Sequence, residues 1–240
     1  MRTANPALSE GTFADRSRTA AGGATMTIQG TVNKTGLLLL FTIGSAAFTW
    51  GSQSMGLLIF GAIGGLIAAL VTVFKKEWAP VTSPVYAVCE GMFLGGISSM
   101  YEAAYPGIVT NAVMLTFGTL FTLLLAYKTG VIKVTQNFRL GVIAATGGIG
   151  LVYMATILLS FFGIRMPFIH DAGPLGIGIS LFIVIVAALN LVLDFDFIER
   201  GAGAGVPKYM EWYAAFGLLV TLIWLYLEIL RLLSKLNRRR

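Results

Sequence analysis

The chain has 240 residues, of which 56% are hydrophobic and 12% are charged, and its mean hydropathy is +0.81. Soluble domains carry about 25% charged residues, and a soluble core of this size could not bury so much apolar surface. The net charge of +6 is spread over loops and termini, which argues against nucleic-acid binding. The composition therefore predicts an all-α, polytopic membrane protein whose first partner is the lipid bilayer.

The first 34 residues are small and polar, and we expect them to form a disordered cytoplasmic tail. Seven apolar runs follow, and each is close to the ~20 residues that cross ~30 Å of hydrocarbon. Their approximate limits are 35–51, 55–74, 84–104, 108–127, 140–162, 175–197 and 213–234. Because backbone in lipid must satisfy its own hydrogen bonds and no run alternates as barrel strands do, the segment 35–234 is predicted to form seven transmembrane helices. A basic tail, 235–240, ends the chain.

Two residue patterns agree with this segmentation. Prolines are predicted to lie at or between helix ends, where they cost a helix least, at positions 80, 84, 106, 167, 174 and 207. Small residues recur at four-residue spacing, in the pairs Gly61 and Gly65, Gly91 and Gly95, Gly95 and Ser99, and Gly176 and Ser180. This spacing indicates close packing between helices of one bundle, with a homodimer interface as the alternative.

The basic residues predict the orientation of the chain. With seven crossings and a cytoplasmic amino terminus, eleven of the seventeen Lys and Arg residues lie on the cytoplasmic side. That excess favours an amino terminus inside the cell. The basic residues of 235–240 would then lie outside, so an even number of crossings with one re-entrant run remains an alternative.

The chain has only one cysteine and one histidine, which argues against an enzymatic site. The single cysteine, Cys89, lies in an apolar run and is predicted to be a small buried side chain. His170 is the only histidine, so a His/Cys zinc set cannot form, and no nucleophile motif lies near it. The Gly-Ala repeat at 201–205 follows no predicted strand and is read as a flexible loop. We expect no enzymatic activity and no resident cofactor.

Acidic residues lie inside or at the ends of the apolar runs. Asp194 is the deepest acid of the sixth run, whereas Asp196 and Glu199 lie nearer the following loop. Asp194 and Asp196 point about 200° apart on a helix, so both cannot face one cavity. Glu90 lies one or two turns into the third run, and Glu102 lies at its outer end. An aspartate at a helix centre costs about 2.5 to 3.5 kcal/mol, so such acids usually line a cavity, find a partner or mark an ion route.

Glu228 lies inside the last run, and two interpretations of it are open. Arg231 is three residues later on the same helix face, so the two can form an internal ion pair. Alternatively, Glu228 faces Asp194 across the sixth and seventh helices. Two carboxyls in a low-dielectric site cannot readily both ionise, so they would titrate as a unit and form a pH-sensitive latch. Once deprotonated, the pair could attract a cation, and calcium prefers such oxygen ligands.

The sequence around these acids resembles a known family. Residues 187–199, which contain an aliphatic-Asp string, resemble the sixth helix of the Bax inhibitor-1 (TMBIM, YccA-like) membrane proteins. Residues 225–233 resemble the last helix of that family, whose pattern is Leu-Tyr-Leu-Asp-Ile followed by aliphatic residues. Asn5-Pro6 through Thr35 resembles the opening of a bacterial branch. The resemblance covers the whole membrane portion.

The resemblance implies seven helices with the last one central, and a pH-dependent calcium leak gated by a carboxyl pair. The pair maps onto Asp194 and Glu228, which would also be the tentative calcium ligands, with Asp196, Arg231 and Glu90 as auxiliary charges. Two departures are that the second acid is Glu rather than Asp and that the acids are 34 residues apart, farther than in the family pattern.

The depth of Glu228 depends on where the last helix enters the membrane. If residues 210–215 form an interfacial stretch, Glu228 reaches mid-membrane and can meet Asp194. If the helix enters at Tyr209, Glu228 lies some ~28 Å deep at ~1.5 Å per residue and is out of reach. The family also uses a basic lock residue on an earlier helix, which the sequence does not place.

A second function fits the same features. The chain could be a non-conducting membrane regulator that binds other membrane proteins, such as a quality-control protease, through its basic tails. A proton-coupled transporter would show inverted repeats, and the two halves of the chain show none. We expect a multi-pass protein of the bacterial inner membrane in either case.

Overall fold

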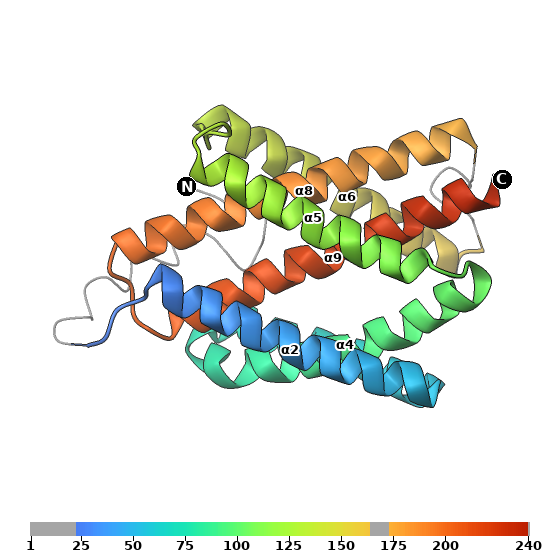
Figure 1. The fold of residues 1–240 in the computed structure, drawn as a ribbon, viewed down its shortest axis with the longest axis horizontal. Helices are drawn as coiled ribbons and strands as arrows, with labels where there is room; N and C mark the ends of the chain where they lie inside the picture. Colours follow the sequence, from blue (N-terminus) through green and yellow to red (C-terminus); the bar gives the residue numbers. More distant parts are fainter. Residues whose placement is uncertain (1–22, 164–172, 240) are drawn as a thin grey trace. The chain divides into compact units, whose positions relative to one another are not determined.

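The computed structural model describes residues 23–163 and 173–239, so His170 lies outside the described residues. Within these ranges the chain forms seven α-helices and one short 3-10 helix (Figure 1). In chain order they are α2 (Ile28–Ser52), α3 (Met55–Phe74), η1 (Lys76–Trp78), α4 (Ala79–Ala104), α5 (Ile108–Lys128), α6 (Gln136–Phe161), α8 (Pro174–Gly203) and α9 (Met210–Arg238). The predicted all-α, multi-pass architecture is confirmed.

Six of the described helices are long and apolar enough to cross a membrane, and α4 is the exception. It spans 26 residues, which is long enough, but it contains two prolines and the acids Glu90 and Glu102 among many small residues. These residues lower the mean hydropathy of α4. The helix nevertheless corresponds to the third predicted run, 84–104. Its ten buried residues show that α4 is covered by protein along much of its length.

The helix boundaries follow the predicted runs, with extensions at several ends. The bounds of α3 are those predicted, whereas α2 begins at Ile28, so residues 28–34 are helical rather than part of a tail. The early start has a local cause, because the Thr27 hydroxyl accepts a hydrogen bond from the Gly30 N–H at 2.9 Å and caps the helix. Pro84 lies inside α4 rather than at its end, because that helix begins five residues before the predicted run, at Ala79.

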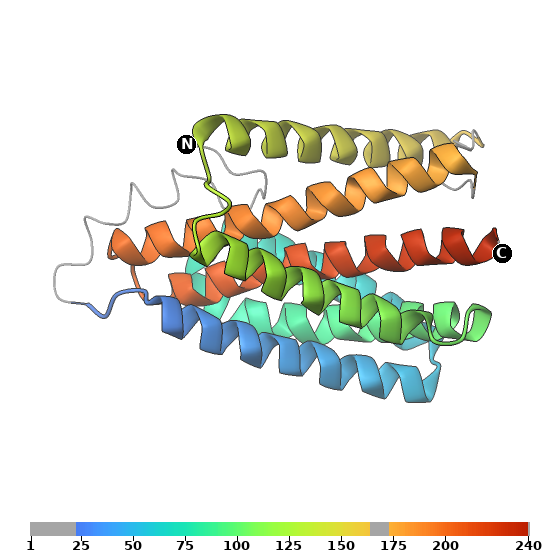
Figure 2. The same ribbon diagram turned by 45° about the horizontal axis from the view of Figure 1, so that its top comes forward.

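The described residues divide into two compact units. Unit 1 contains residues 23–104 and 194–220, which form α2, α3, α4, the end of α8 and the start of α9. Within it α4 packs against both α2 and α3. The helices α2 and α4 run in the same direction and α3 runs in the opposite one (Figures 1 and 2). The ring of Tyr86 on α4 meets Phe216 on α9 edge-on, with 4.9 Å between ring centroids.

Glycines allow the helices of unit 1 to approach closely. A Cβ atom added at Gly95 would overlap the backbone of Ala46 on α2, and one at Gly91 would overlap the backbone of Thr42. A Cβ at Gly61 on α3 would overlap the backbone of α4. The predicted role of these small residues in helix packing within the chain is therefore confirmed.

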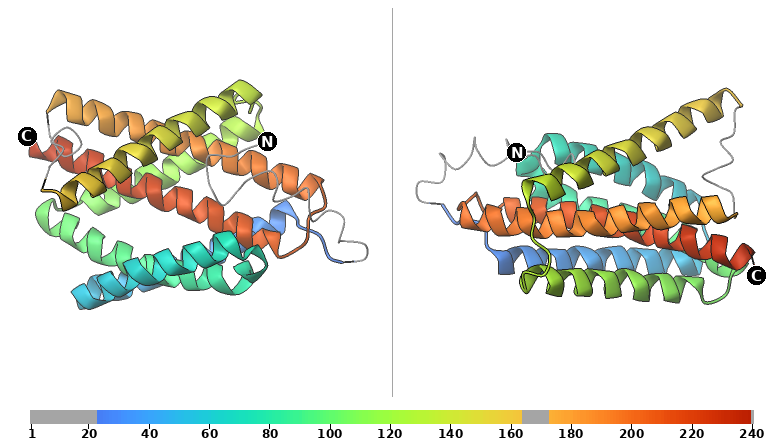
Figure 3. Two further views of the ribbon diagram at one scale, coloured as in Figure 1. Left: turned by 180° about the vertical axis from the view of Figure 1, so that it is seen from behind. Right: turned by 90° about the horizontal axis from the view of Figure 1, so that it is seen from above.

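Unit 2 contains residues 105–163, 173–193 and 221–239, which form α5, α6, the first part of α8 and the last part of α9. Its core contains Ile149 of α6 with Ile183 and Val186 of α8, and Trp224 of α9 packs against them. Both α8 and α9 continue without a break from one unit to the other (Figure 3). These two helices therefore contribute residues to both units.

Burial differs strongly among the apolar helices. In α9, 61% of the most apolar stretch is buried, against 11% in α6. The apolar stretch of α9 is therefore mostly covered by protein, whereas that of α6 is mostly exposed. Large apolar side chains such as Phe60 and Leu66 of α3 remain exposed. In a chain with spans of this length, such apolar surfaces are expected to contact lipid.

Candidate functional site

Glu228 lies on α9 in unit 2 and is 2% exposed. The Arg231 guanidinium donates to its two carboxylate oxygens, at 3.0 and 3.1 Å. The Tyr153 hydroxyl of α6 also donates to the carboxylate, at 2.7 Å. Arg231 in addition donates to the Tyr153 oxygen and lies 5.3 Å from the centre of its ring. The internal ion pair, the first of the two interpretations of Glu228, is thus confirmed, and Tyr153 completes it from another helix.

This arrangement offsets the cost of a buried charge. A carboxylate away from water is tolerated when a charged partner and further hydrogen bonds compensate it. The bridging hydroxyl of Tyr153 receives one hydrogen bond and donates another, so it links the two charges of α9 to α6. We name Tyr153, Glu228 and Arg231 the tyrosine-bridged pair.

Lys235 continues the same face of α9 and is 4% exposed. Its ammonium donates to the Gly176 carbonyl at 3.0 Å and to the Ser180 hydroxyl at 2.8 Å, both on α8. The sequence assigned Lys235 to the basic tail 235–240, whereas α9 continues to Arg238 and this amine is buried. Gly176 and Ser180, predicted as a packing pair, also supply its oxygen acceptors.

Asp194 lies on α8 in unit 1 and is 2% exposed, and it follows the buried residues Leu191, Val192 and Leu193 along the chain. Asp196 forms an ion pair with Arg200 one turn later. The deep acid and the acid near the helix end thus have different surroundings, as their two-residue spacing predicts.

The proposed pairing of Asp194 with Glu228 stays a prediction, since the two residues belong to different units. The structure does decide the local geometry of the last helix. Because α9 is unbroken from Met210, residues 210–215 are helical and continuous with the rest of α9. Glu228 lies about 27 Å along the helix axis from that start, at ~1.5 Å per residue.

The auxiliary acid Glu90 lies on α4, where it is half-buried. Its carboxylate lies against Gly65 of α3, since a Cβ there would come within 2.6 Å of the Glu90 Oε2 atom. The neighbouring Cys89 is a free, buried thiol, as predicted. No group of three or more His, Cys, Asp or Glu side chains able to hold a metal ion occurs in the described part of the chain.

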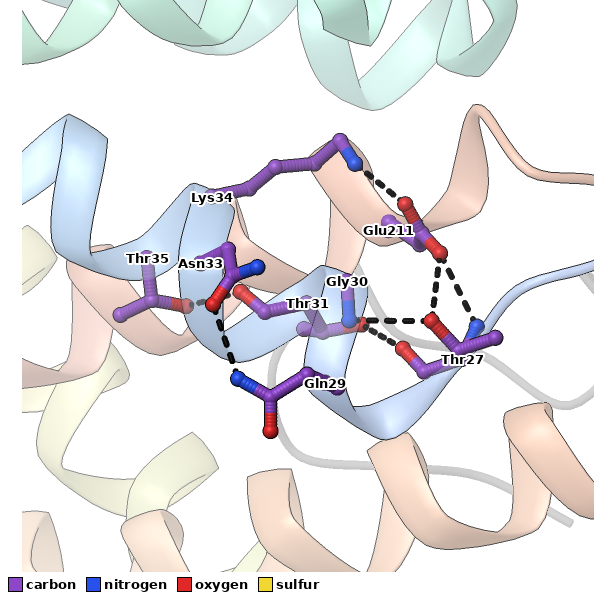
Figure 4. A network of polar contacts seen from close by, with 8 residues as sticks. All are labelled: Thr27, Gln29, Gly30, Thr31, Asn33, Lys34, Thr35 and Glu211. Carbon is purple, nitrogen blue, oxygen red and sulfur yellow. Dashed lines mark hydrogen bonds and ion pairs between the residues drawn. The ribbon is translucent and has the colours of Figure 1, made fainter.

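A third buried acid, Glu211, lies in the first turn of α9 and is 1% exposed. Figure 4 shows its contacts with Thr27 and Lys34. One of its oxygens accepts hydrogen bonds from the N–H and the hydroxyl of Thr27, both at 3.0 Å. The other forms an ion pair with Lys34 of α2. The Lys34 ammonium also lies 5.5 Å from the ring centre of Trp212. We name Thr27, Lys34 and Glu211 the amino-terminal clasp.

Backbone hydrogen bonds extend the clasp toward the loop before α9. The Met26 N–H donates to the Val206 carbonyl at 2.8 Å, and the Lys208 N–H donates to the Ala24 carbonyl at 3.0 Å. The segment that leads into α2 is therefore fastened to the segment that leads into α9. Both segments belong to unit 1.

With this geometry in place, comparison with known protein families identifies the chain. A family model described as Bax inhibitor 1 like matches residues 5–238. The chain belongs to this family. No curated protein and no solved structure matches it.

In this Bax inhibitor 1 like protein, the sequence did not predict the amino-terminal clasp or the contribution of Tyr153 to the tyrosine-bridged pair. Lys34 and Glu211 lie just outside the predicted runs that begin at 35 and 213, so neither was predicted to have a partner. The available signals were an acid in the first turn of a helix and a Thr-Gly cap, which are local. No local signal connects Lys34 to Glu211, or Tyr153 to Glu228.

Proposed function

We propose that this Bax inhibitor 1 like protein is a pH-sensitive calcium (cation) leak channel of the bacterial inner membrane, with its amino terminus in the cytoplasm. The observation that carries the proposal is the burial of two carboxylates, Asp194 and Glu228, in membrane-spanning helices, each 2% exposed. Acids at such positions are costly, and they commonly mark ion or proton routes. The proposal includes no enzymatic step.

The gate works through the protonation of these two acids. Protonated carboxyls can hydrogen-bond and hold α8 and α9 together, whereas ionised carboxylates repel one another and attract a cation. Arg231 and Tyr153 hold the charge of Glu228, so they are part of the pH response in this proposal.

Calcium flux in reconstituted vesicles tests the proposal. Asp194→Asn should leave the fold intact and remove the pH dependence of calcium entry, because the amide cannot titrate. Glu102→Gln neutralises a half-buried acid at the end of α4 and serves as the matched control, with an unchanged pH profile. If calcium flux through Asp194→Asn depends on pH as it does in the unmodified protein, Asp194 is not part of the gate.

Direct contact between the two acids has its own test. Cys89 is the only cysteine, so Cys89→Ser gives a thiol-free background. In it, Asp194→Cys with Glu228→Cys should form a disulfide under mild oxidation if the Cα atoms come within about 4.4–6.8 Å. Failure of this cross-link, with loss of pH dependence in both single neutral variants, would mean that the acids titrate separately.

The regulator remains the competing function, and a truncation separates the two. Removing residues 1–22 leaves the clasp residues in place, whereas a longer deletion would also remove part of α2. The leak channel keeps its calcium flux after this truncation. A regulator that binds membrane proteins through its tail loses its partner instead.

A further inference from the structure

A cavity of about 520 Å³ lies in unit 2, where the start of α5 meets the end of α9. It is lined by Ile108, Asn111, Leu233, Leu236, Asn237 and Arg239. Its volume falls in the range of about 300–1,000 Å³ that small-molecule sites occupy. None of the six lining residues is acidic, and one is cationic.

The lining is divided between polar and apolar chemistry. Asn111, Asn237 and Arg239 supply N–H donors, and a guanidinium binds phosphate oxygens through two parallel hydrogen bonds. Ile108 is 1% exposed and forms a buried apolar wall, whereas Leu236 is 43% exposed. A ligand that fits this lining carries a negatively charged, oxygen-rich group next to hydrocarbon.

Charges around the cavity favour the same kind of ligand. The Arg238 guanidinium donates to the Tyr105 hydroxyl at 3.1 Å, which ties the end of α9 to the residues before α5. The positive end of the α5 dipole lies at Ile108 and adds to the potential. Arg238 and Arg239 add two exposed positive charges at this end of α9, and clustered charge of one sign attracts ligands of the opposite sign.

We propose that this cavity binds the phosphate of an anionic phospholipid, with the Arg239 guanidinium on the phosphate oxygens and the two asparagine amides beside it. The glycerol and upper acyl chains lie against Leu233 and Leu236. The volume holds a head group and its glycerol, so the rest of the acyl chains extends along the apolar outer surface. This lipid site is independent of the calcium leak.

Native mass spectrometry of the full-length protein in detergent tests the site. The protein is titrated with phosphatidylglycerol or with phosphatidylcholine of the same acyl composition, and a further titration adds inorganic phosphate as competitor. Phosphatidylglycerol should bind more tightly than phosphatidylcholine, and Arg239→Gln should weaken it by at least about tenfold, the effect of one charge-assisted hydrogen bond. Arg239→Lys should recover part of the affinity, because it keeps the charge but not the two parallel hydrogen bonds.

Lys133→Gln is the matched control, since it removes an exposed positive charge from the loop between α5 and α6. It should leave lipid binding unchanged. The proposal is overturned if Arg239→Gln binds phosphatidylglycerol as the unmodified protein does, or if both lipids bind equally. Displacement of the lipid by millimolar inorganic phosphate would also overturn it, since the site would then recognise phosphate without the lipid. Asn111→Leu, at a second point of the lining, should repeat the loss.

Discussion

Replacing Glu211 with alanine removes a carboxylate that is 1% exposed and that accepts hydrogen bonds from Thr27 and from Lys34. Breaking a buried ion pair by removing one partner costs about 3–5 kcal/mol. The Lys34 side chain is 19% exposed, so water can solvate part of the stranded ammonium and reduce the loss. We therefore expect Glu211→Ala to lower the free energy of unfolding by about 3 kcal/mol.

A loss of that size is easily measured. For chains of 150–250 residues, each kcal/mol lowers Tm by about 2–4 °C, so Tm should fall by about 6–12 °C. Cys89 supplies the assay, because it is the only cysteine and is 7% exposed. A thiol-reactive dye that fluoresces on reaction reports the temperature at which unfolding exposes this thiol.

A double-mutant cycle separates the ion pair from general damage. Lys34→Met alone should also destabilise, and the double variant should lose less than the sum of the two, with a coupling of about 1–2 kcal/mol. Asn33→Ala, which removes only an exposed hydrogen bond with Gln29 on the same helix, is the control and should change stability by no more than about 0.5 kcal/mol. The ion pair does not stabilise the fold if Glu211→Ala has the same Tm as Asn33→Ala, or if the coupling free energy between Glu211 and Lys34 is zero.

The same thermal assay checks three further expectations. Gly95→Ala should lower the free energy of unfolding by about 1–3 kcal/mol, because its Cβ would overlap the Ala46 carbonyl. The control Gly141→Ala should change stability little, because no atom lies within 4 Å of the added Cβ. Equal Tm values for the two variants would contradict the packing argument. Tyr153→Phe should cost about 1–2 kcal/mol, since the carboxylate loses a donor from α6, and an unchanged Tm would show that the hydroxyl adds nothing. Ser180→Ala should cost about 1–3 kcal/mol by removing an acceptor from the buried ammonium of the last helix, and a higher Tm would contradict that bond.

The positions of the helices could be predicted from the sequence, because an apolar run of membrane length is a local property of the chain. An apolar run of membrane length has to be helical, since its backbone groups find no other partners in lipid, and α3 has the predicted bounds 55–74. The close approach at Gly91 and Gly95 was also predictable, because four-residue spacing places small residues on one helix face. The ion pair of Glu228 with Arg231 follows from three-residue spacing in the same way.

The polar partners between helices were decided only by the tertiary structure. Tyr153 is 75 residues from Glu228, and Lys34 is 177 residues from Glu211. Which side chains meet depends on how each helix is rotated and how far it slides along its neighbours, and the apolar residues around each helix permit many such arrangements. Side-chain packing selects one of them, and that selection brings together charges that look unrelated along the chain.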